Sequence, residues 1–323
     1  MIHHGVDTIS FLSQEIIKDD PGSSSHWNKF HSDFEFTGSG FKGLKGFGGS
    51  SKPYTGLKYL MSQVLQEKFR MMGKLNKSFL PIEKTFKSIL KQQGRAFDLD
   101  VLRQIITVSY LKYHLPNKLS PSSTIVVIGD GFGTMATLLL ANNFAKTVIL
   151  VNLNKTLLVD LWYLKMFLGD EKFQKSVKLI TELSDLASLE SAGDPEETRV
   201  IAIQASNHEI LKDCPIDLAI NIASMQEMDP QYIRNYFDDL YAVAAKRDLD
   251  FYCCNREEKT LPDGTVTRFK DYPWNSLDSI KIDELCPWHQ EYYYYIPPFY
   301  RPYDGPHRHQ IRKLTGEGYE QHI

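Results

Sequence analysis

The length, composition and charge of the chain are those of a soluble globular protein: 323 residues, 42% hydrophobic and 24% charged, with a formal net charge of −3. No basic run is long enough for a nucleic-acid footprint, and no apolar run approaches the ~18 residues of a membrane span. The first residues lack the basic start and apolar core of a signal peptide, so we expect a cytoplasmic protein with neither nucleic acid nor membrane as partner.

The cysteines and histidines show no spacing that is typical of a metal site. Cys214, Cys253, Cys254 and Cys286 form no C-x-x-C pair, and H-x-H, D-x-D and H-E-x-x-H are absent from the sequence. We therefore expect core or surface thiols rather than a disulfide or zinc framework, and we name no metal ligands; whether a metal takes part in the function stays open.

The N-terminal part begins with an amphipathic helix or loose arm over 1–20, which Asp-Pro-Gly-Ser-Ser-Ser at 20–25 interrupts. The following stretch to Tyr54 mixes aromatic residues with glycines, namely Gly38, Gly40, Gly43, Gly46, Gly48 and Gly49. It is either a flexible loop or a lid, in which Trp27, Phe30 and Phe41 would stack on a sugar or adenine.

Residues 57–115 show helical periodicity, with Gly94 as a break between helices. We expect a helical subdomain that caps a cofactor and shapes an acceptor pocket, joined through the linker 117–123 to the rest. The predicted division is 1–117, an arm, glycine-rich lid and helical cap, and 118–323, a Rossmann-like domain with a C-terminal substrate-binding extension.

The stretch from Thr124 to Asn154 predicts a strand, a glycine-rich turn, a helix and a second strand. Glycines allow close approach of a ligand to the backbone, and the helix start directs free N–H groups at the same place. The turn reads G-x-G-x-G from Gly129 to Gly133, whereas a dinucleotide fingerprint would need a third glycine at Thr134. The βαβ unit indicates a parallel sheet and a nucleotide-like cofactor.

The remaining chain continues the α/β alternation. Helices are predicted at 155–168 and over 170–197, and strands at 199–204, 216–222 and 249–254. The fold class is therefore α/β, a Rossmann-like, mostly parallel sheet with helices on both faces, plus the N-terminal helical subdomain. The G-x-G-x-G spacing from Gly129 to Gly133 resembles the first motif of class I methyltransferases, which implies that the sheet is of the class I methyltransferase type.

The C-terminal part departs from that alternation. Pro262-Asp263-Gly264 predicts a hairpin turn, and residues 292–296 predict a late strand. The proline-rich and aromatic segment from 297 onward predicts an exposed tail or a dimer contact, which makes a homodimer one option.

Three stretches resemble a family of bacterial sugar O-methyltransferases. They are IGDGFGTMATLLL, then IDLAINIASMQEMDPQYIRNYF at 216–237, and FYCCNREE with the later DYPW. The resemblance runs from about Ser24 to Trp288, and only the glycine motif is diagnostic beyond this family. It implies a domain that binds S-adenosyl-L-methionine (SAM) and a sugar or glycoconjugate hydroxyl as the methyl acceptor.

The resemblance and the fold together indicate which residues meet the cofactor. These follow the successive strands: Gly129, Asp130, Gly131, Gly133, Asn152, Leu153, Gln204, Ala205 and Asn221. Two positions depart from the usual pattern, because Val127 and Asn152 stand where many SAM enzymes have an acid. Asparagine offers one carbonyl acceptor and no charge, so we expect a weaker grip on the ribose hydroxyls.

Methyl transfer to a hydroxyl needs an oriented acceptor and a base for its proton. Glu227, just beyond the fourth strand, is the first candidate, as a carboxylate with a raised pKa; it could instead stabilise the next helix start. His289 is the second candidate, since it titrates near neutrality; an ordinary surface or core histidine is the alternative.

Two groups of residues are expected to bind the acceptor. Trp27, Gln226 and Arg256 form the first group, and Asp271, Tyr272 and Trp274 form the second. In the second group an aromatic face would pack on the C–H surface of a sugar while a carboxylate accepts hydroxyl hydrogen bonds. A turn anchored by Pro273 explains the same three residues without a ligand.

Two other functions stay open. An NAD(P)- or nucleotide-sugar-binding oxidoreductase would use a similar fold, although the third glycine is missing and no Tyr-x-x-x-Lys pair follows the fourth strand. A catalytically inactive Rossmann-like binding protein is favoured by Val127 and Asn152. Ligands separate the three functions, because SAM, NAD(P) or neither should raise the midpoint of thermal unfolding.

Overall fold

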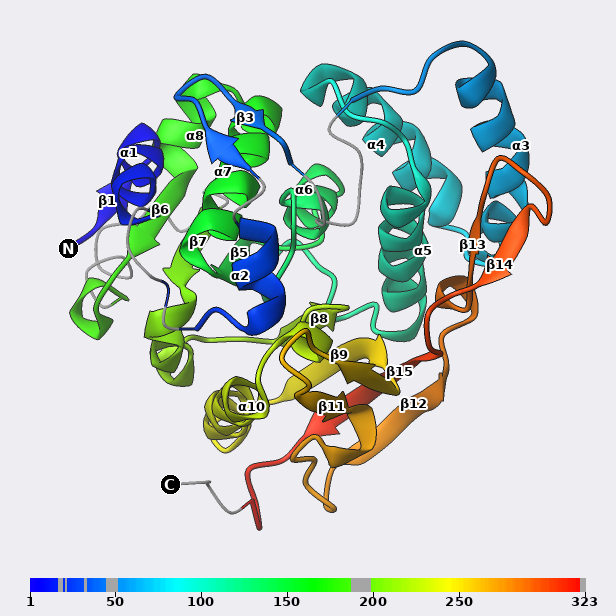
Figure 1. Ribbon diagram of the computed structural model, residues 1–323. Coiled ribbons are helices and arrows are strands. Elements are labelled where there is room, and N and C mark those ends of the chain that lie inside the picture. Colours follow the sequence, from blue (N-terminus) through cyan, green and yellow to red (C-terminus); the bar gives the residue numbers. More distant parts are fainter. Residues whose placement is uncertain (17–19, 21, 32–33, 45–51, 187–198, 320–323) are drawn as a thin grey trace.

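A β-sheet forms the centre of the computed structural model (Figure 1), which describes residues 1–16, 20, 22–31, 34–44, 52–186 and 199–319. Within these residues its nine strands lie in the order β1 (His3–His4), β6 (Val177–Ile180), β7 (Arg199–Gln204), β5 (Thr147–Asn152), β4 (Thr124–Ile128), β8 (Leu218–Ile222), β9 (Leu249–Arg256), β15 (His307–Leu314) and β12 (Ser279–Leu285). The strands β6, β7, β5, β4, β8 and β9 run parallel, whereas β1 and β15 pair antiparallel with their neighbours.

The strand order defines the fold class. Strands β4, β5 and β7 lie in reverse chain order on one side, and β8 and β9 follow on the other, so the order reverses between β4 and β8. Ligands of such sheets bind at this switch point, beyond the carboxyl ends of the strands. The predicted Rossmann-like, mostly parallel sheet is confirmed. Its antiparallel β15, inserted between β9 and β12, differs from the dinucleotide-binding order of about six strands, 3-2-1-4-5-6.

Helices and short strand pairs complete the described chain. The helices are α1 (Val6–Glu15), α2 (Ser25–His31), α3 (Gly56–Gly73), α4 (Phe79–Gln93), α5 (Leu99–His114), α6 (Thr134–Ala141), α7 (Asn154–Leu168), α8 (Asp170–Ser176), η1 (Ala205–Asp213), η2 (Met225–Glu227), α10 (Pro230–Ala244), η3 (Phe269–Asp271) and η4 (Pro287–His289), where η marks a 3₁₀-helix. The short antiparallel pairs are β2 (Glu35–Phe36) with β3 (Phe41–Lys42), β10 (Glu258–Thr260) with β11 (Val266–Arg268), and β13 (Glu291–Tyr293) with β14 (Tyr300–Pro302). None of the described helices combines the length and apolarity that a membrane crossing requires.

Both faces of the sheet are covered, because its central strands are apolar on both sides. On β4, Ile125 and Val127 join a core with α4, α5, α6 and α7, whereas Val126 and Ile128 join a second core with η1 and α10. Such near-continuous apolar runs are typical of parallel strands buried on both faces.

The helices predicted over 57–115 are present as α3, α4 and α5. Phe69, Phe86 and Ile105 belong to the same apolar cluster as Val127 of the sheet, so these helices share a core with the Rossmann-like part. The domain division at residue 117 stays a prediction.

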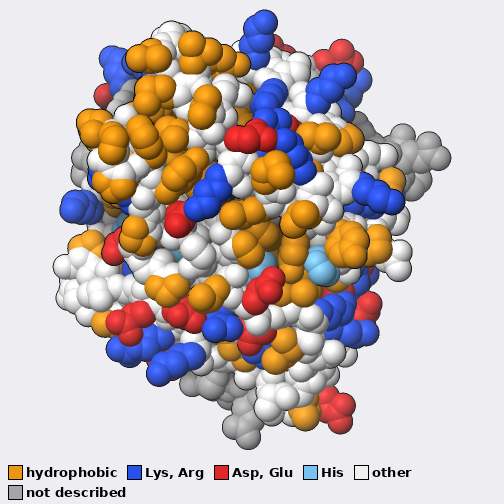
Figure 2. All heavy atoms as spheres, turned by 90° about the vertical axis from the view of Figure 1, so that its right-hand side faces the viewer, with side chains coloured by type: hydrophobic (Ala, Val, Ile, Leu, Met, Phe, Trp, Pro, Cys, Tyr) orange, Lys and Arg blue, Asp and Glu red, His pale blue; other side chains and the backbone are white. Residues whose placement is uncertain are grey.

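The face that bears α3 and the β13–β14 hairpin carries exposed apolar side chains (Figure 2). On α3, Leu57, Leu60 and Val64 are 72%, 61% and 72% exposed. They lie at i, i+3 and i+7, so they share one side of the helix. A homodimer stays a prediction from the sequence.

The C-terminal segment is not the exposed tail that its prolines and polar residues indicated. Residues 307–314 form β15, which pairs along its whole length with β9 and on its other edge with β12. His307, Gln310 and Ile311 are buried there. The polar sequence HRHQIRKL lacks the alternation of a half-buried strand, so its periodicity gave no strand signal.

Of three further predictions of secondary structure, one is confirmed and two differ in extent from the structure. The helix expected over 170–197 ends at Ser176 and gives way to β6, because Val177, Leu179 and Ile180 are buried against β7; residues 187–198 lie outside the described part. The hairpin around Asp263 is confirmed by the pairing of β10 with β11. The late strand expected over 292–296 is shorter and ends at Tyr293.

The position of β15 between β9 and β12 predicts a large effect of truncating Ile311, which is 0% exposed. Ile311→Ala should lower the free energy of unfolding by about 2–5 kcal/mol, since it leaves a cavity in the core. Lys313→Ala is the control on the same strand, because Lys313 is half exposed and should cost less than about 1 kcal/mol. Denaturant unfolding measures both, and equal small effects would contradict a buried inner strand.

Candidate functional site

The main cavity lies at the carboxyl ends of the parallel strands, beside the switch point between β4 and β8. Its volume is about 180 Å³, and its walls come from the turns after β4, β5 and β8, the end of β9, and residues of α2, α5, η4 and β15. The N-terminal helices and the C-terminal strand therefore complete a site that the Rossmann-like sheet begins.

The glycine turn after β4 forms one wall of the cavity. Gly129, Gly131 and Gly133 all have left-handed backbone conformations, with φ of 73°, 69° and 55°. A Cβ added at Gly129 would lie 1.9 Å from Oγ of Ser224, and one at Gly133 would lie 2.7 Å from the backbone oxygen of Asp160. Glycine is thus required at both positions by backbone conformation and by close packing.

Asp130 shapes this turn. Its two carboxylate oxygens accept hydrogen bonds from the backbone N–H groups of Met135 and Ala136, both at 2.8 Å, at the start of α6. Burial raises the pKa of Asp130 to about 6, although these hydrogen bonds and the charge of Arg95 oppose the shift. Asp130 lines the cavity, but its carboxylate mainly contacts the first turn of α6, the helix that follows it.

Asn152, at the end of β5, is oriented by a buried carboxylate. Its Nδ2 donates to Oδ2 of Asp160 at 2.8 Å, and its Oδ1 accepts from the N–H of Leu153 at 3.0 Å. Asp160 is 0% exposed and also accepts from the N–H of Gly133 at 2.9 Å. Because both oxygens of Asp160 accept, the amide group of Asn152 faces it and Oδ1 stays available on the cavity side. An amide therefore fits this place where a carboxylate would not.

Glu227 does not have the properties expected of a general base. Its carboxylate is 2.7 Å from Nζ of Lys259 and 3.3 Å from Nε2 of His26. Burial opposes ionisation, but the hydrogen bond from His26 and the charge of Lys259 outweigh it and hold the pKa of Glu227 below its usual value. The structure thus corrects the expectation of a raised pKa: Glu227 is a stable carboxylate that ties α2 to the β10–β11 hairpin.

Two stacked histidines face the cavity from the C-terminal part. The rings of His289 and His307 lie 5.1 Å apart between centroids. Nε2 of His289 and Nδ1 of His307 are buried and have no hydrogen-bond partner among the described residues. Burial, with the charge of Arg103, lowers the pKa of His289 well below its ordinary value; burial, with Arg256, lowers that of His307 to about 3. Both imidazoles are therefore neutral near pH 7.

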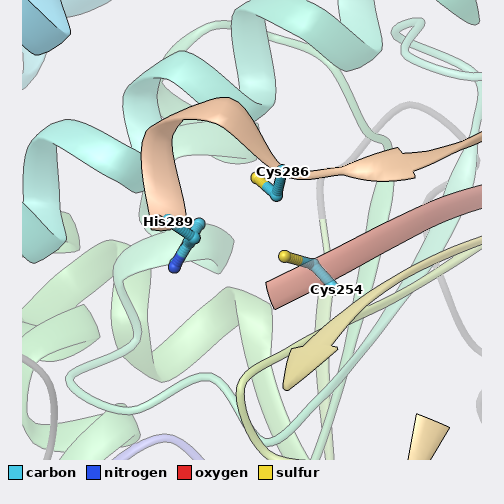
Figure 3. Close-up of side chains that lie close together, drawn as sticks. All are labelled: Cys254, Cys286 and His289. Atoms are coloured by element: carbon cyan, nitrogen blue, oxygen red, sulfur yellow. The ribbon is translucent and has the colours of Figure 1, made fainter. Parts of the chain in front are cut away.

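Two thiols lie behind His289 (Figure 3). Cys254 at the end of β9, Cys286 before η4 and His289 are buried, and one potential ligand atom of each lies within 4.8 Å of the others. Soft thiolate and imidazole ligands suit zinc or copper(I). Burial raises the pKa of Cys286 well above its ordinary value, so the neutral thiol is favoured. In Figure 3 both sulfur atoms lie on the side of their residues that faces His289, and the visible ring nitrogen lies on the side of the imidazole away from them.

The structure brings many of the predicted site residues together. Those that line the main cavity are Gly129, Asp130, Gly131, Asn152, Glu227, His289, Trp27, Gln226 and Arg256. Leu153 and Ala205 line a smaller adjoining pocket of about 20 Å³, which shares Trp27, Gly129 and Asn152 with the cavity. The expected cofactor and acceptor sides thus meet at the switch point.

Three predicted cofactor residues lie behind the walls instead. Gly133 serves the turn, and the side chain of Gln204 is buried and donates to Oδ1 of Asn154 at 2.7 Å. Asn221 is 0% exposed and donates to the carbonyl oxygen of Ile128 at 2.8 Å. These residues hold strand ends in place, so direct contact with a cofactor does not follow for them.

Asp271, Tyr272 and Trp274 do not reach the cavity. Tyr272 and Trp274 pack on Phe237 of α10, with the Trp274 and Phe237 ring centroids 4.7 Å apart. Asp271 lies 3.9 Å from Arg268 on the surface. Their sequence indicated a turn or a sugar site. In the structure the two aromatic rings belong to the apolar core between the sheet and α10. They are not sugar ligands of this cavity.

The helix α2 and the described residues just before it lie against one wall of the cavity. Oγ of Ser24 donates to the backbone oxygen of Glu227 at 2.5 Å, and Oδ2 of Asp20 accepts from the N–H of Asn154 at 2.7 Å. Trp27 of α2 lines both the cavity and the small pocket. In the predicted glycine-rich lid, Phe41 packs on Trp162, and residues 45–51 lie outside the described part.

Several lining residues gave no signal in the sequence. Gln104 comes from α5, Tyr303 from the segment after β14 and His307 from β15, and Arg95 and Asp160 act beneath the turn. His307 lay in the segment taken for a tail. Asp160 is a carboxylate inside an apolar helix, LLVDLWYL, which is the one pattern that could have marked it.

No family model and no curated protein matches the sequence. The solved structures that align with it include magnesium protoporphyrin IX methyltransferase (ChlM) of Synechocystis PCC 6803 with bound SAH, at 13% identity, 79% of this chain, 99% of that chain and TM-score 0.38. M. capricolum TrmK in complex with the cofactor product S-adenosyl-homocysteine aligns at 13% identity, 66% and 70% coverage and TM-score 0.35. TM-scores of this size carry no argument, so the site is judged on its geometry.

The hydrogen bond between Asn152 and Asp160 can be tested by exchanging the amide and the carboxyl group between the two positions. Asn152→Asp should destabilise the protein by about 1–3 kcal/mol at neutral pH, because two carboxylates would face each other in a buried place. The double variant Asn152→Asp with Asp160→Asn restores one amide and one carboxylate and should recover most of the loss. Thermal unfolding measures all three proteins.

The loss of stability in Asn152→Asp should depend on pH in a defined direction. In Asn152→Asp the close pair raises one carboxyl pKa above its unfolded value, so the protonated pair is stable at low pH and the stability is lost as pH rises through that folded pKa. The deficit should therefore shrink from about pH 8 to about pH 5. A deficit that is independent of pH, or no rescue by the swap, would contradict the contact.

Proposed function

We propose that this chain is a SAM-dependent O-methyltransferase that methylates a hydroxyl of a sugar or glycoconjugate. One observation carries the proposal: a single cavity at the switch point combines a glycine turn, an amide acceptor at the end of β5, and a neutral, buried imidazole. The resemblance of the glycine motif and the 216–237 stretch to sugar O-methyltransferases supports the same reading.

The residues around the turn fit the cofactor. Gly129 and Gly131 line the cavity with left-handed backbone that allows close approach, and Oδ1 of Asn152 is directed by Asp160 to accept from ribose hydroxyls. Leu153 offers apolar packing in the small adjoining pocket. When bound, SAM supplies an electrophilic methyl group on a positively charged sulfur.

The residues opposite the turn suit an acceptor hydroxyl. Nε2 of His289 would accept the hydroxyl proton while the oxygen forms its bond to the methyl carbon and the sulfur–carbon bond breaks. Oε1 of Gln104 and Nε of Arg256 are buried without partners among the described residues. Oε1 of Gln104 can therefore accept a hydrogen bond from a further hydroxyl group, and Nε of Arg256 can donate one. The chain thus orients the acceptor and removes its proton.

The oxidoreductase alternative is less well supported. Thr134 replaces the third glycine of the dinucleotide fingerprint, and its Oγ1 accepts from Arg95 at 3.2 Å beneath the turn. The antiparallel β15 beside β9 also departs from the dinucleotide-binding strand order.

Isothermal titration with S-adenosylhomocysteine tests the cofactor assignment. Wild-type protein should bind with a Kd on the order of micromolar, and Gly131→Arg should abolish binding because the side chain would fill the cavity wall. Gly169→Arg is the matched control, since Gly169 has a similar φ of 75° but open space around it. Tighter binding of NAD(P) than of S-adenosylhomocysteine would overturn the assignment in favour of the oxidoreductase.

The role of His289 predicts a loss in kcat. His289→Gln should lower kcat by about 10²–10⁴-fold while the KM for SAM changes little, because the base is removed and the cofactor side is left intact. Burial lowers the pKa of His289, so its neutral form persists as pH falls and the acid limb of kcat/KM should lie below about 6.5. An acid limb at or above that value, or an unchanged kcat in the variant, would rule out this role.

A further inference from the structure

A second hollow adjoins the main cavity on the side of the β13–β14 hairpin. Its volume is about 560 Å³, within the ~300–1,000 Å³ range of small-molecule sites. Asp100, Arg256 and Tyr303 line both hollows, so a ligand that fills one borders the other. Methyl transfer itself, as argued above, uses no residue that belongs to the second hollow alone.

Tyrosines dominate the wall of this hollow, which we call the tyrosine groove: Tyr54, Tyr292, Tyr293, Tyr295 and Tyr303. They come from the segment before α3, from β13 and its turn, and from the segment after β14. The rings of Tyr293 and Tyr295 lie edge to face, 5.8 Å apart. Three chain segments therefore converge to present aromatic faces and hydroxyl groups to one space.

Burial keeps three hydroxyl groups of the groove in the neutral form. Burial raises the pKa of Tyr54, Tyr293 and Tyr303 above the ordinary value, so these phenols remain donors. Oη of Tyr293 accepts from Nε2 of Gln66 at 3.0 Å, and the buried Oη of Tyr295 lies close enough to the hydroxyls of Tyr54 and Tyr293 to raise their pKa. Several buried hydroxyls around one space favour a ligand that brings polar groups of its own.

The charges of the groove disfavour an anionic ligand. Arg103 donates to the backbone oxygens of Trp288 and Glu291 at 2.9 and 2.6 Å and to Asp100 at 2.9 Å, so its guanidinium is committed. Nη1 of Arg256 donates to Asp304 at 3.0 Å. Arg103 therefore offers no bidentate contact to a phosphate, and the charge of Arg256 is already paired with that of Asp304. Aromatic faces with carboxylate acceptors suit an uncharged, polyhydroxylated ring instead.

We propose that the tyrosine groove binds a second, uncharged sugar ring of the acceptor. The substrate is then a glycoside of at least two rings, with the methylated ring in the main cavity beside His289 and its neighbour against Tyr295 and Tyr303. This inference rests on the proposed methyltransferase function and names its substrate class more narrowly.

The test compares acceptors of two lengths. Methyl hexopyranosides and disaccharides that contain the same hexose are assayed for methyl transfer from SAM, with wild-type protein and with Tyr295→Ala, Tyr295→Phe and Tyr294→Ala. Tyr294 is the matched control, since it neighbours Tyr295 but is 45% exposed and lies outside the groove wall. Thermal unfolding verifies that each variant is folded, and Tyr295→Phe keeps the ring if the alanine variant is not.

The wild-type protein should favour the disaccharide by at least about tenfold in kcat/KM, a difference typical of one good contact surface. Tyr295→Ala should bring that ratio to about one while changing kcat/KM for the monosaccharide by less than about twofold, and Tyr295→Phe should fall between, because it loses only the hydroxyl. Tyr294→Ala should behave as wild type.

Two results would overturn the inference in different ways. Equal kcat/KM for both lengths in the wild type, or a disaccharide preference that survives in Tyr295→Ala, would refute the second-ring site and leave the methyltransferase function standing. Methyl transfer to no sugar of either length would refute the proposed function itself, and the inference with it.

Discussion

A single buried carboxyl group holds together the wall of the cavity that we propose for the cofactor. Asp160 of α7 accepts one hydrogen bond from the glycine turn, through the N–H of Gly133, and another from Asn152 at the end of β5. Burial, and then the nearby charge of Asp130, raise the pKa of Asp160 well above its ordinary value, with Arg95 opposing the shift. Such a group is retained in a core only when its partners compensate for desolvation. The contact therefore fixes which residue can stand at position 152.

This contact changes the meaning of the missing acid at the end of the second strand. Taken alone, Asn152 indicates a weakened ribose site or an inactive protein. Beside Asp160, the amide is the side chain that can donate inward and still present an oxygen to the cavity. The acidic side chain, Asp160, lies one layer behind the cavity wall, so asparagine at position 152 does not favour an inactive protein.

The wall of the cavity opposite the glycine turn depends on the C-terminal strand. Insertion of β15 between β9 and β12 carries His307 to the cavity, where its ring stacks on that of His289, and the β13–β14 hairpin places tyrosines next to it. The parallel sheet provides the turn that we propose for the cofactor, and the two ends of the chain provide the wall that we propose for the acceptor. In the proposed function, substrate choice would therefore depend on segments outside the βαβ core.

The sequence could predict the parts that follow from local rules. Short apolar runs identified β4, β5, β7, β8 and β9, and the glycine spacing identified the turn after β4, because each of these signals lies within a few consecutive residues. It could not identify β15, whose polar residues are buried only through pairing, or the pairing of Glu227 with Lys259, 32 positions away, which lowers a pKa expected to be raised. The prediction that Asp271, Tyr272 and Trp274 bind a sugar was wrong for a related reason, since local sequence does not say which face of the sheet a turn will cover.

The measurement that tests the central claim most directly is a crystal structure of the protein with S-adenosylhomocysteine. We expect the ribose hydroxyls within hydrogen-bond distance of Oδ1 of Asn152, whose Nδ2 still donates to Asp160, and the sulfur on the side of the cavity that faces His289. A ligand seated elsewhere, or a cavity in which Asn152 has left Asp160 and touches no ribose, would contradict the account.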